Sequence, residues 1–347
     1  MKRTITSIKQ QLISTGHLAR ILMALWLISS LILGFGLIVD DLSTRIIGAI
    51  LGTAYIVVLI WFLARSKPRA ADLPHSEPIV RLFPQYRWML CFVILLTLVL
   101  VLLTSFLFQD GWLTLLFSIP FSFVIIILWR KRINRRFLIA SIITVILLAI
   151  AEQLLGADMS SGLIIPIGAG FMFLAGVLLL DHTRLTCIRL LDGDYLQAGK
   201  SLLWGCVLAL PPALLNAVLM RFTAPSQFDL LFDRWWEPLY ALQPGLLEEI
   251  WARLLLTTVI YALLRPVRGK RPQCALNWAL LLAAFIHGMA HYPGSIINPL
   301  EGFYITIMYG IPLGLLYVKR DLEQAVIYHF FIDLVRFTAF TIWNTSA

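Results

Sequence analysis

Charged residues are scarce in this chain. They make up 14% of its 347 residues, whereas a soluble domain averages about 25%. Hydrophobic residues make up 60% of the chain, and the mean hydropathy is +0.86. This composition argues against a water-soluble globular protein. It predicts a protein that crosses a membrane several times.

Cysteine is also rare. The four cysteines, Cys91, Cys187, Cys206 and Cys274, lie in or beside hydrophobic segments. None of them belongs to a C-x-x-C pair or to another spacing that is typical of metal sites. We therefore expect free thiols rather than a disulfide framework.

Acidic residues are fewer than basic ones, 19 against 28, which gives a net charge of +9. A basic excess can indicate nucleic-acid binding. Here, however, the cations lie in short loops between apolar runs, as in Arg130-Lys131-Arg132. We therefore expect a lipid bilayer and no nucleic acid as a partner.

About eleven apolar runs are long enough, or nearly so, to span a bilayer, and they predict an all-α polytopic transmembrane bundle. The predicted spans lie near Ile21–Val39, Ile46–Leu63, Trp88–Phe108, Trp112–Trp129, Phe137–Leu155, Ile164–Leu180, Ser201–Met220, Tyr240–Leu264, Leu276–Tyr292, Phe303–Val318 and Leu322–Phe340. Most Lys and Arg residues fall on one side of this bundle if the N-terminus is inside the cell. We expect that topology, with the basic Met1 to Arg20 stretch flanking the first span rather than forming a cleavable signal.

Ionisable residues are distributed unevenly among the predicted spans. The first five carry almost none at depth, with Glu152 as the main exception, whereas polar groups cluster after residue 240. We therefore expect an N-terminal accessory bundle over residues 1–160 and a chemical core over residues 161–347.

Two adjacent carboxylates and an arginine lie within one predicted span, in Glu248-Glu249-Ile-Trp-Ala-Arg253. Ionisable groups at this depth are costly and usually functional. Glu249 and Arg253 are i,i+4 neighbours and can neutralise each other. Glu248 then has no partner on its own helix.

Two later spans carry histidines. His287 and His291 are i,i+4 neighbours near the outer end of one span, and His329 and Asp333 are i,i+4 neighbours in the last span. Arg336 lies one turn beyond Asp333 and can pair with it. The predicted topology places Glu248 and His291 in the outer half of the bilayer and His329 somewhat deeper. We therefore expect these groups to meet.

These motifs, in this order on consecutive helices, resemble those of the CPBP intramembrane proteases, which include the CAAX prenyl endopeptidases and Abi-type proteins. The resemblance runs from about Ile164 to the C-terminus. It implies a glutamate-dependent peptidase that needs no metal or other cofactor. It also implies a membrane-anchored protein or peptide as the substrate.

The resemblance implies a role for each matched residue. Glu248 and His291 would hold and activate the attacking water, and His329 with the residue at 333 would stabilise the oxyanion. Glu249 and Arg253 would shape the site or hold substrate.

Two positions depart from the family pattern. His287 stands where Phe is usual, and Asp333 stands where Asn is usual. An ionised aspartate cannot donate a hydrogen bond, so we expect Asp333 to orient His329. His287 is a candidate second donor or part of the water site.

Other interpretations remain open at this stage. The charged pairs can be structural, and the histidines can simply bridge helices. His287, His291 and Glu248 also suggest zinc, although H-E-x-x-H is absent. The same polar cluster would fit a non-catalytic scaffold or a bacteriocin-immunity-type protein, and a transporter is a third possibility. The short loops favour the cytoplasmic membrane of a prokaryote, and we expect an intramembrane endopeptidase there.

Overall fold

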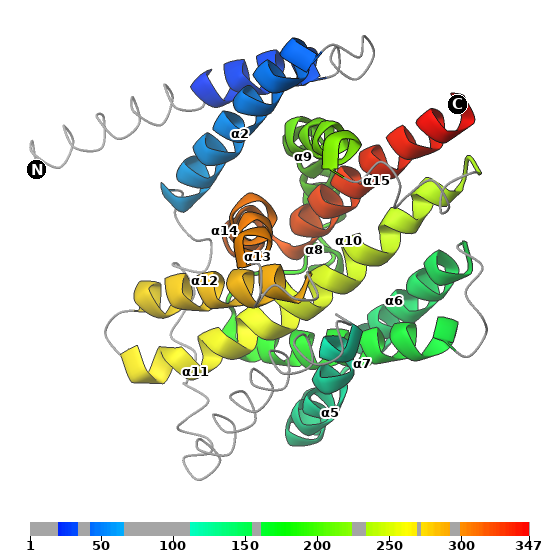
Figure 1. Ribbon diagram of the computed structural model, residues 1–347. Coiled ribbons are helices and arrows are strands. Elements are labelled where there is room, and N and C mark those ends of the chain that lie inside the picture. The colour runs from blue at the N-terminus through cyan, green and yellow to red at the C-terminus, as the bar shows by residue number, and fades with distance from the viewer. Residues whose placement is uncertain are drawn as a thin grey trace, which may run out of the picture.

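Figure 1 shows a computed structural model of the chain, which describes residues 20–33, 42–65, 112–154, 161–223, 234–268, 272–291 and 299–346. Within these ranges the ordered elements are helices, and no strand occurs. The all-α prediction is therefore confirmed. The longer helices are α2 (Leu42–Arg65), α5 (Trp112–Trp129), α6 (Arg135–Leu154), α7 (Ser161–Thr183), α9 (Tyr195–Thr223), α12 (Pro272–Ala290) and α15 (Leu322–Ser346).

The remaining helical elements are shorter, and two groups of them are continuous. One long helix, yellow in Figure 1, consists of α10 (Leu242–Glu248), the π-helical segment η5 (Glu249–Thr257) and α11 (Thr258–Arg268). A second consists of α13 (Pro299–Ile305), the π-helical segment η6 (Thr306–Gly310) and α14 (Ile311–Lys319). Short turns complete the set: η3 (Arg130–Arg132), α8 (Arg189–Asp192) and η4 (Glu237–Ala241).

Seven helices in the described ranges are long and apolar enough to cross a membrane, judged by length and composition. The predicted first span is represented by the shorter helix Arg20–Leu33, and the predicted span near Trp88–Phe108 lies outside the described residues. The predicted spans near Trp112–Trp129 and Tyr240–Leu264 are α5 and the long α10–η5–α11 helix. The chain is therefore a multi-pass membrane protein. The predicted number of spans, about eleven, is approximate.

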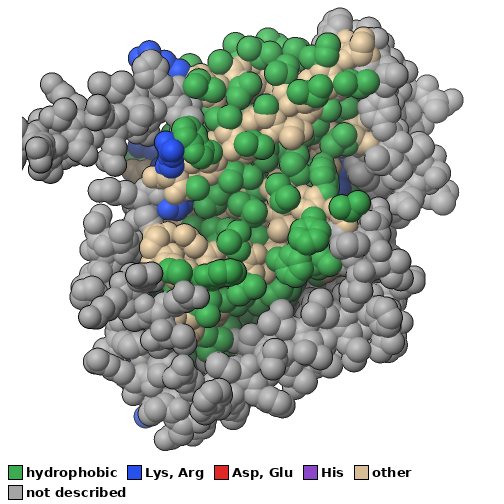
Figure 2. Space-filling view, turned by 60° about the vertical axis from the view of Figure 1, so that its left-hand side comes forward, with side chains coloured by type: hydrophobic (Ala, Val, Ile, Leu, Met, Phe, Trp, Pro, Cys, Tyr) green, Lys and Arg blue, Asp and Glu red, His purple; other side chains and the backbone are tan. Residues whose placement is uncertain are grey.

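The surface agrees with this conclusion. Figure 2 shows a face on which hydrophobic side chains cover most of the described area and no carboxylate is visible. Exposed apolar side chains recur along single helix faces, such as Ile142, Ile146 and Ile150 on α6. Lipid can solvate such a face, and water cannot do so without a large free-energy cost.

The helices share one continuous core. Helix α7 packs against α5, α6 and η5, and α15 packs against α9 and α10. Buried residues from both predicted domains, including Leu59, Ile125, Leu178 and Leu254, belong to the same hydrophobic cluster. The division at residue 160 stays a prediction.

Close contacts at glycines set how α10 and α12 dock. A Cβ at Gly245 would lie 2.7 Å from Cα of Phe330 on α15. On α12, a Cβ at Gly288 would lie 2.1 Å from Oγ1 of Thr306 and 2.5 Å from the carbonyl oxygen of Gly302. Both contacts lie beside the polar residues predicted to form a site, so they fix the positions of those residues.

Replacing Gly288 by Ala is expected to lower the free energy of unfolding by about 1–3 kcal/mol, because the new methyl group overlaps the backbone of the neighbouring helix. Gly199→Ala is the matched control, since a Cβ at Gly199 on α9 would meet nothing within 4 Å. Alanine should stabilise that helix by up to about 1 kcal/mol. Denaturant unfolding of both purified variants in detergent would test this. Equal stability of the two variants would contradict the tight helix contact.

The start of α15 is anchored by Asp321. This buried carboxylate accepts hydrogen bonds from the Arg189 guanidinium, from Ser201 Oγ at 2.6 Å and from the backbone N–H of Gln324 at 2.9 Å. The last contact satisfies one of the free N–H groups in the first turn of α15. Helices α8, α9 and α15 are thereby held together, and the register of α15 is fixed upstream of His329.

Candidate active site

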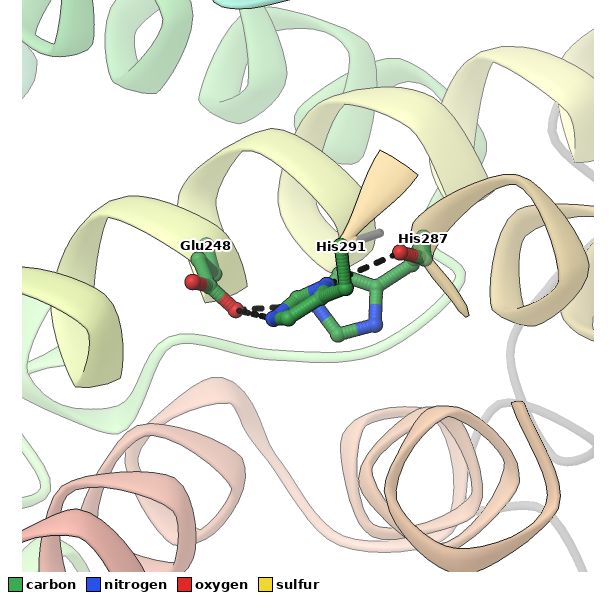
Figure 3. Close-up of side chains that lie close together, drawn as sticks. All are labelled: Glu248, His287 and His291. Atoms are coloured by element: carbon green, nitrogen blue, oxygen red, sulfur yellow. Dashed lines mark hydrogen bonds and ion pairs between the residues drawn. The ribbon is translucent and has the colours of Figure 1, made fainter. Parts of the chain in front are cut away.

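Glu248 and two histidines at the C-terminal end of α12 meet side by side (Figure 3). Glu248 is the last residue of α10, His287 lies in the last turn of α12, and His291 directly follows that helix. Oε2 of Glu248 is 3.0 Å from Nε2 of His287 and 3.1 Å from Nε2 of His291. Glu248, which has no predicted partner on its own helix, therefore contacts two histidines, His287 and His291.

A third imidazole reaches the same carboxylate from α15. Nε2 of His329 lies 3.7 Å from Oε2 of Glu248, while its Nδ1 lies 2.9 Å from Oε1 of Glu249. Because a carboxylate accepts, His329 donates its Nδ1–H to Glu249. Glu248 and Glu249 thus lie beside different nitrogens of the same His329 ring. Helices α10, α12 and α15 converge at this point.

The predicted pair of Glu249 and Arg253 is present and fully buried. Nε of Arg253 lies 3.4 Å from Oε2 of Glu249, and the two side chains are 1% and 0% exposed. Among the described residues, neither Nη1 nor Nη2 of Arg253 has a hydrogen-bond partner. Buried guanidinium groups are normally satisfied, so these N–H groups stand out as an unusual feature of the cluster.

Asp333 lies between Arg336 and His329. Its Oδ1 is 2.9 Å from Nη2 of Arg336, which confirms the predicted pair, and its Oδ2 is 3.5 Å from Nε2 of His329. Asp333 was expected to orient His329. The shorter contact to that ring comes from Glu249, so Glu249 is the main orienting group and Asp333 faces the opposite nitrogen.

The protons in this cluster are constrained by the geometry. Nδ1 of His291 lies 3.0 Å from the carbonyl oxygen of His287, so it carries a proton that it donates. Nε2 of the same ring faces the Glu248 carboxylate at 3.1 Å. A carboxylate and an imidazole at this distance can share a proton, and such a pair is suited to acid–base chemistry.

The cluster is open on one side. The side chains of Glu248 and His291 are 23% and 31% exposed, whereas His287 is 1% exposed. Glu248 and His291 therefore have accessible surface, while His287 is buried. Trp251 packs beside His287 at a ring-centroid distance of 6.1 Å, and its indole N–H donates to Ser118 Oγ of α5 at 2.8 Å.

The sequence did not reveal two features of the site. One is the direct contact of His287 with Glu248, for which the only signal was the i,i+4 spacing to His291. The other is Ser118, which links α5 of the predicted accessory bundle to the site through Trp251. A serine in an apolar helix gave no specific signal, because serines often hydrogen-bond to their own helix.

Fold and site together define a multi-pass membrane protein with a buried cluster of carboxylates and imidazoles. Residues 231–335 match the family model described as type II CAAX prenyl endopeptidase Rce1-like. This segment contains all seven predicted site residues, and the match supports the predicted similarity to the CPBP/CAAX protease family. The family supports an intramembrane CAAX-type endopeptidase in general. The match begins at residue 231, whereas the expected resemblance began near Ile164. No curated protein and no solved structure gives a significant match.

Proposed function

We propose that the protein hydrolyses a peptide bond of a membrane-associated protein or peptide by means of water activated by glutamate and histidine. The membrane we propose is the cytoplasmic membrane of a prokaryote. The observation that carries this proposal is the convergence of three imidazoles, from the end of α12 and from α15, on one oxygen of Glu248. A carboxylate in this position is a suitable general base, and the imidazoles are suitable partners for the water and for the charge that develops on the substrate.

The water would be held between Glu248 and His291, the two members of the cluster that are accessible. Glu248 accepts a proton as the water oxygen bonds to the peptide carbonyl carbon. When the C–N bond breaks, the same proton passes to the leaving amine. General acid–base catalysis of this kind contributes about 100- to 10,000-fold to a rate.

His329 is the candidate donor to the oxyanion. Glu249 holds its Nδ1–H at 2.9 Å, so Nε2 is directed at the space beside Glu248. As an imidazolium it would donate from Nε2 to the developing negative charge. Asp333, at 3.5 Å, would position this nitrogen, and Arg253 would offer its free Nη groups to a backbone carbonyl of the substrate.

The proposal predicts that removing divalent metals does not lower the rate of hydrolysis, because every step uses a side chain of the chain itself. The measurement is the initial rate of cleavage of a membrane-anchored peptide by purified protein in liposomes, with and without EDTA or phenanthroline. Activity that disappears with chelator and returns with zinc would contradict the metal-free mechanism and favour a zinc peptidase.

A further inference from the structure

Glu248, His287 and His291 also have the geometry of a cation site. The ligand atoms that these three residues offer all lie within 4.8 Å of one another. Two of the separations are 3.0 and 3.1 Å, close to the ~3.4 Å between neighbouring ligands around a tetrahedral ion with bonds of about 2.1 Å. Figure 3 shows the two rings and one carboxylate oxygen directed at the same space. Small side-chain movements would be enough to admit an ion.

The second contact of His291 supports this interpretation. A histidine that binds a metal through Nε2 usually donates its Nδ1–H to a carbonyl or carboxylate, which fixes the ring. His291 does so at 3.0 Å, to the carbonyl oxygen of His287. The side chain of His291 is 31% exposed, so this edge of the site is accessible, and the side chain of His287 is buried.

The third candidate ligand, His287, departs from the usual family pattern. His287 occupies the position where the resembled family usually has Phe, a side chain that cannot bind a metal. With Phe at this position only Glu248 and His291 would remain, and two ligands hold zinc weakly. Two imidazoles and one carboxylate form the donor set of many zinc hydrolases.

A bound ion would leave the site without a base. Glu248 would be a ligand, Glu249 is held by His329 and Arg253, and Asp333 is paired with Arg336 at 2.9 Å. No other carboxylate is described within this cluster. The ion would also occupy the space where Glu248 and His291 hold the water in the proposed mechanism.

We propose that Glu248, His287 and His291 bind one divalent transition-metal ion of the zinc class, and that the bound ion inhibits peptide hydrolysis. The binding stands on the geometry alone, and the inhibition rests on the proposed function.

Binding is tested on the purified full-length protein in detergent with Co²⁺ as a spectroscopic probe, displaced by Zn²⁺. Wild type should show the visible absorption of low-symmetry Co²⁺ with one ion per chain. His287→Phe should weaken the affinity by more than about 100-fold, since loss of an outer-shell partner already costs about 10- to 100-fold. His182→Asn, at a buried histidine of α7 outside the site, should bind as wild type does. Equal affinity in wild type and His287→Phe would overturn the site.

Inhibition is tested as the ratio of cleavage rates with and without Zn²⁺ for each protein. This ratio should be low for wild type and His182→Asn and close to one for His287→Phe. Cleavage that is insensitive to Zn²⁺ at saturating occupancy would overturn the inhibition, and cleavage that requires Zn²⁺ would do the same. Metal binding without any peptidase activity would count against the proposed function and leave the binding site standing.

Discussion

Glu248→Gln is expected to lower kcat for peptide hydrolysis by about 100- to 10,000-fold, the usual contribution of a general base. Glutamine keeps the size of the side chain and can still accept a hydrogen bond from His287, so the helix contacts should survive. It cannot take a proton from water. The measurement is the single-turnover rate with a membrane-anchored peptide in liposomes.

The matched control for this variant is Glu152→Gln. Glu152 is also a buried glutamate within an apolar helix, α6, but it lies outside the cluster. Its replacement should leave the cleavage rate unchanged. Equal rates for Glu248→Gln and Glu152→Gln would contradict the role of Glu248 as the general base.

His329→Ala is expected to affect both activity and stability. The loss of an oxyanion donor costs about 3–4 kcal/mol of transition-state stabilisation, or about 100- to 1,000-fold in kcat. The substitution also removes the partner of the fully buried Glu249, and breaking a buried charged pair destabilises by about 3–5 kcal/mol. We therefore expect a lower unfolding midpoint together with the loss of turnover.

The neighbouring Tyr328 provides a control on the same helix. Its hydroxyl is buried and has no hydrogen-bond partner among the described residues. Tyr328→Phe should therefore keep both stability and activity, since it removes an unsatisfied polar group. If His329→Ala retained full stability, the contact between Nδ1 and Glu249 would be contradicted. If it retained full activity, His329 would not be the oxyanion donor.

The all-α fold class and the membrane location could be predicted because they depend on composition and on the length of apolar runs. The pairs Glu249–Arg253 and Asp333–Arg336 could be predicted for a similar reason, since spacings of three and four residues place side chains together on any helix. Both pairs are present. The loop-charge topology and the division at residue 160 remain predictions.

Contacts between helices were harder to predict, because they depend on docking. The i,i+4 spacing placed His287 and His291 on one face but did not show which ring would reach Glu248. The position of both rings relative to Glu248 depends on how α12 docks, and the close approach of Gly288 to Thr306 and Gly302 is part of that docking.

The π-helical turns of η5 were also not predicted. Such turns are often found at functional sites, and no periodicity in Glu249–Thr257 indicated them. Their surroundings are tight: a Cβ at Gly176 of α7 would lie 2.6 Å from Leu254 Cγ. Packing between helices, rather than local propensity, sets this geometry.

The role assigned to Asp333 shows the same limitation. On sequence alone it was the only acidic neighbour of His329 on the same helix, so it was the natural orienting group. In the structure Glu249 reaches Nδ1 of that ring from α10–η5 at a shorter distance. Contacts from another helix can thus replace a local pair, and only the three-dimensional arrangement reveals them.

In the proposed function Glu248, with imidazoles from α15 and from the end of α12, makes water attack a peptide bond. The most direct test is a single-turnover cleavage in heavy-oxygen water with chelator present, read by mass spectrometry of the new carboxyl terminus. Wild type is predicted to give a product with one heavy oxygen, and Glu248→Gln is predicted to give almost none. The same amount of labelled product from both proteins would contradict the claim.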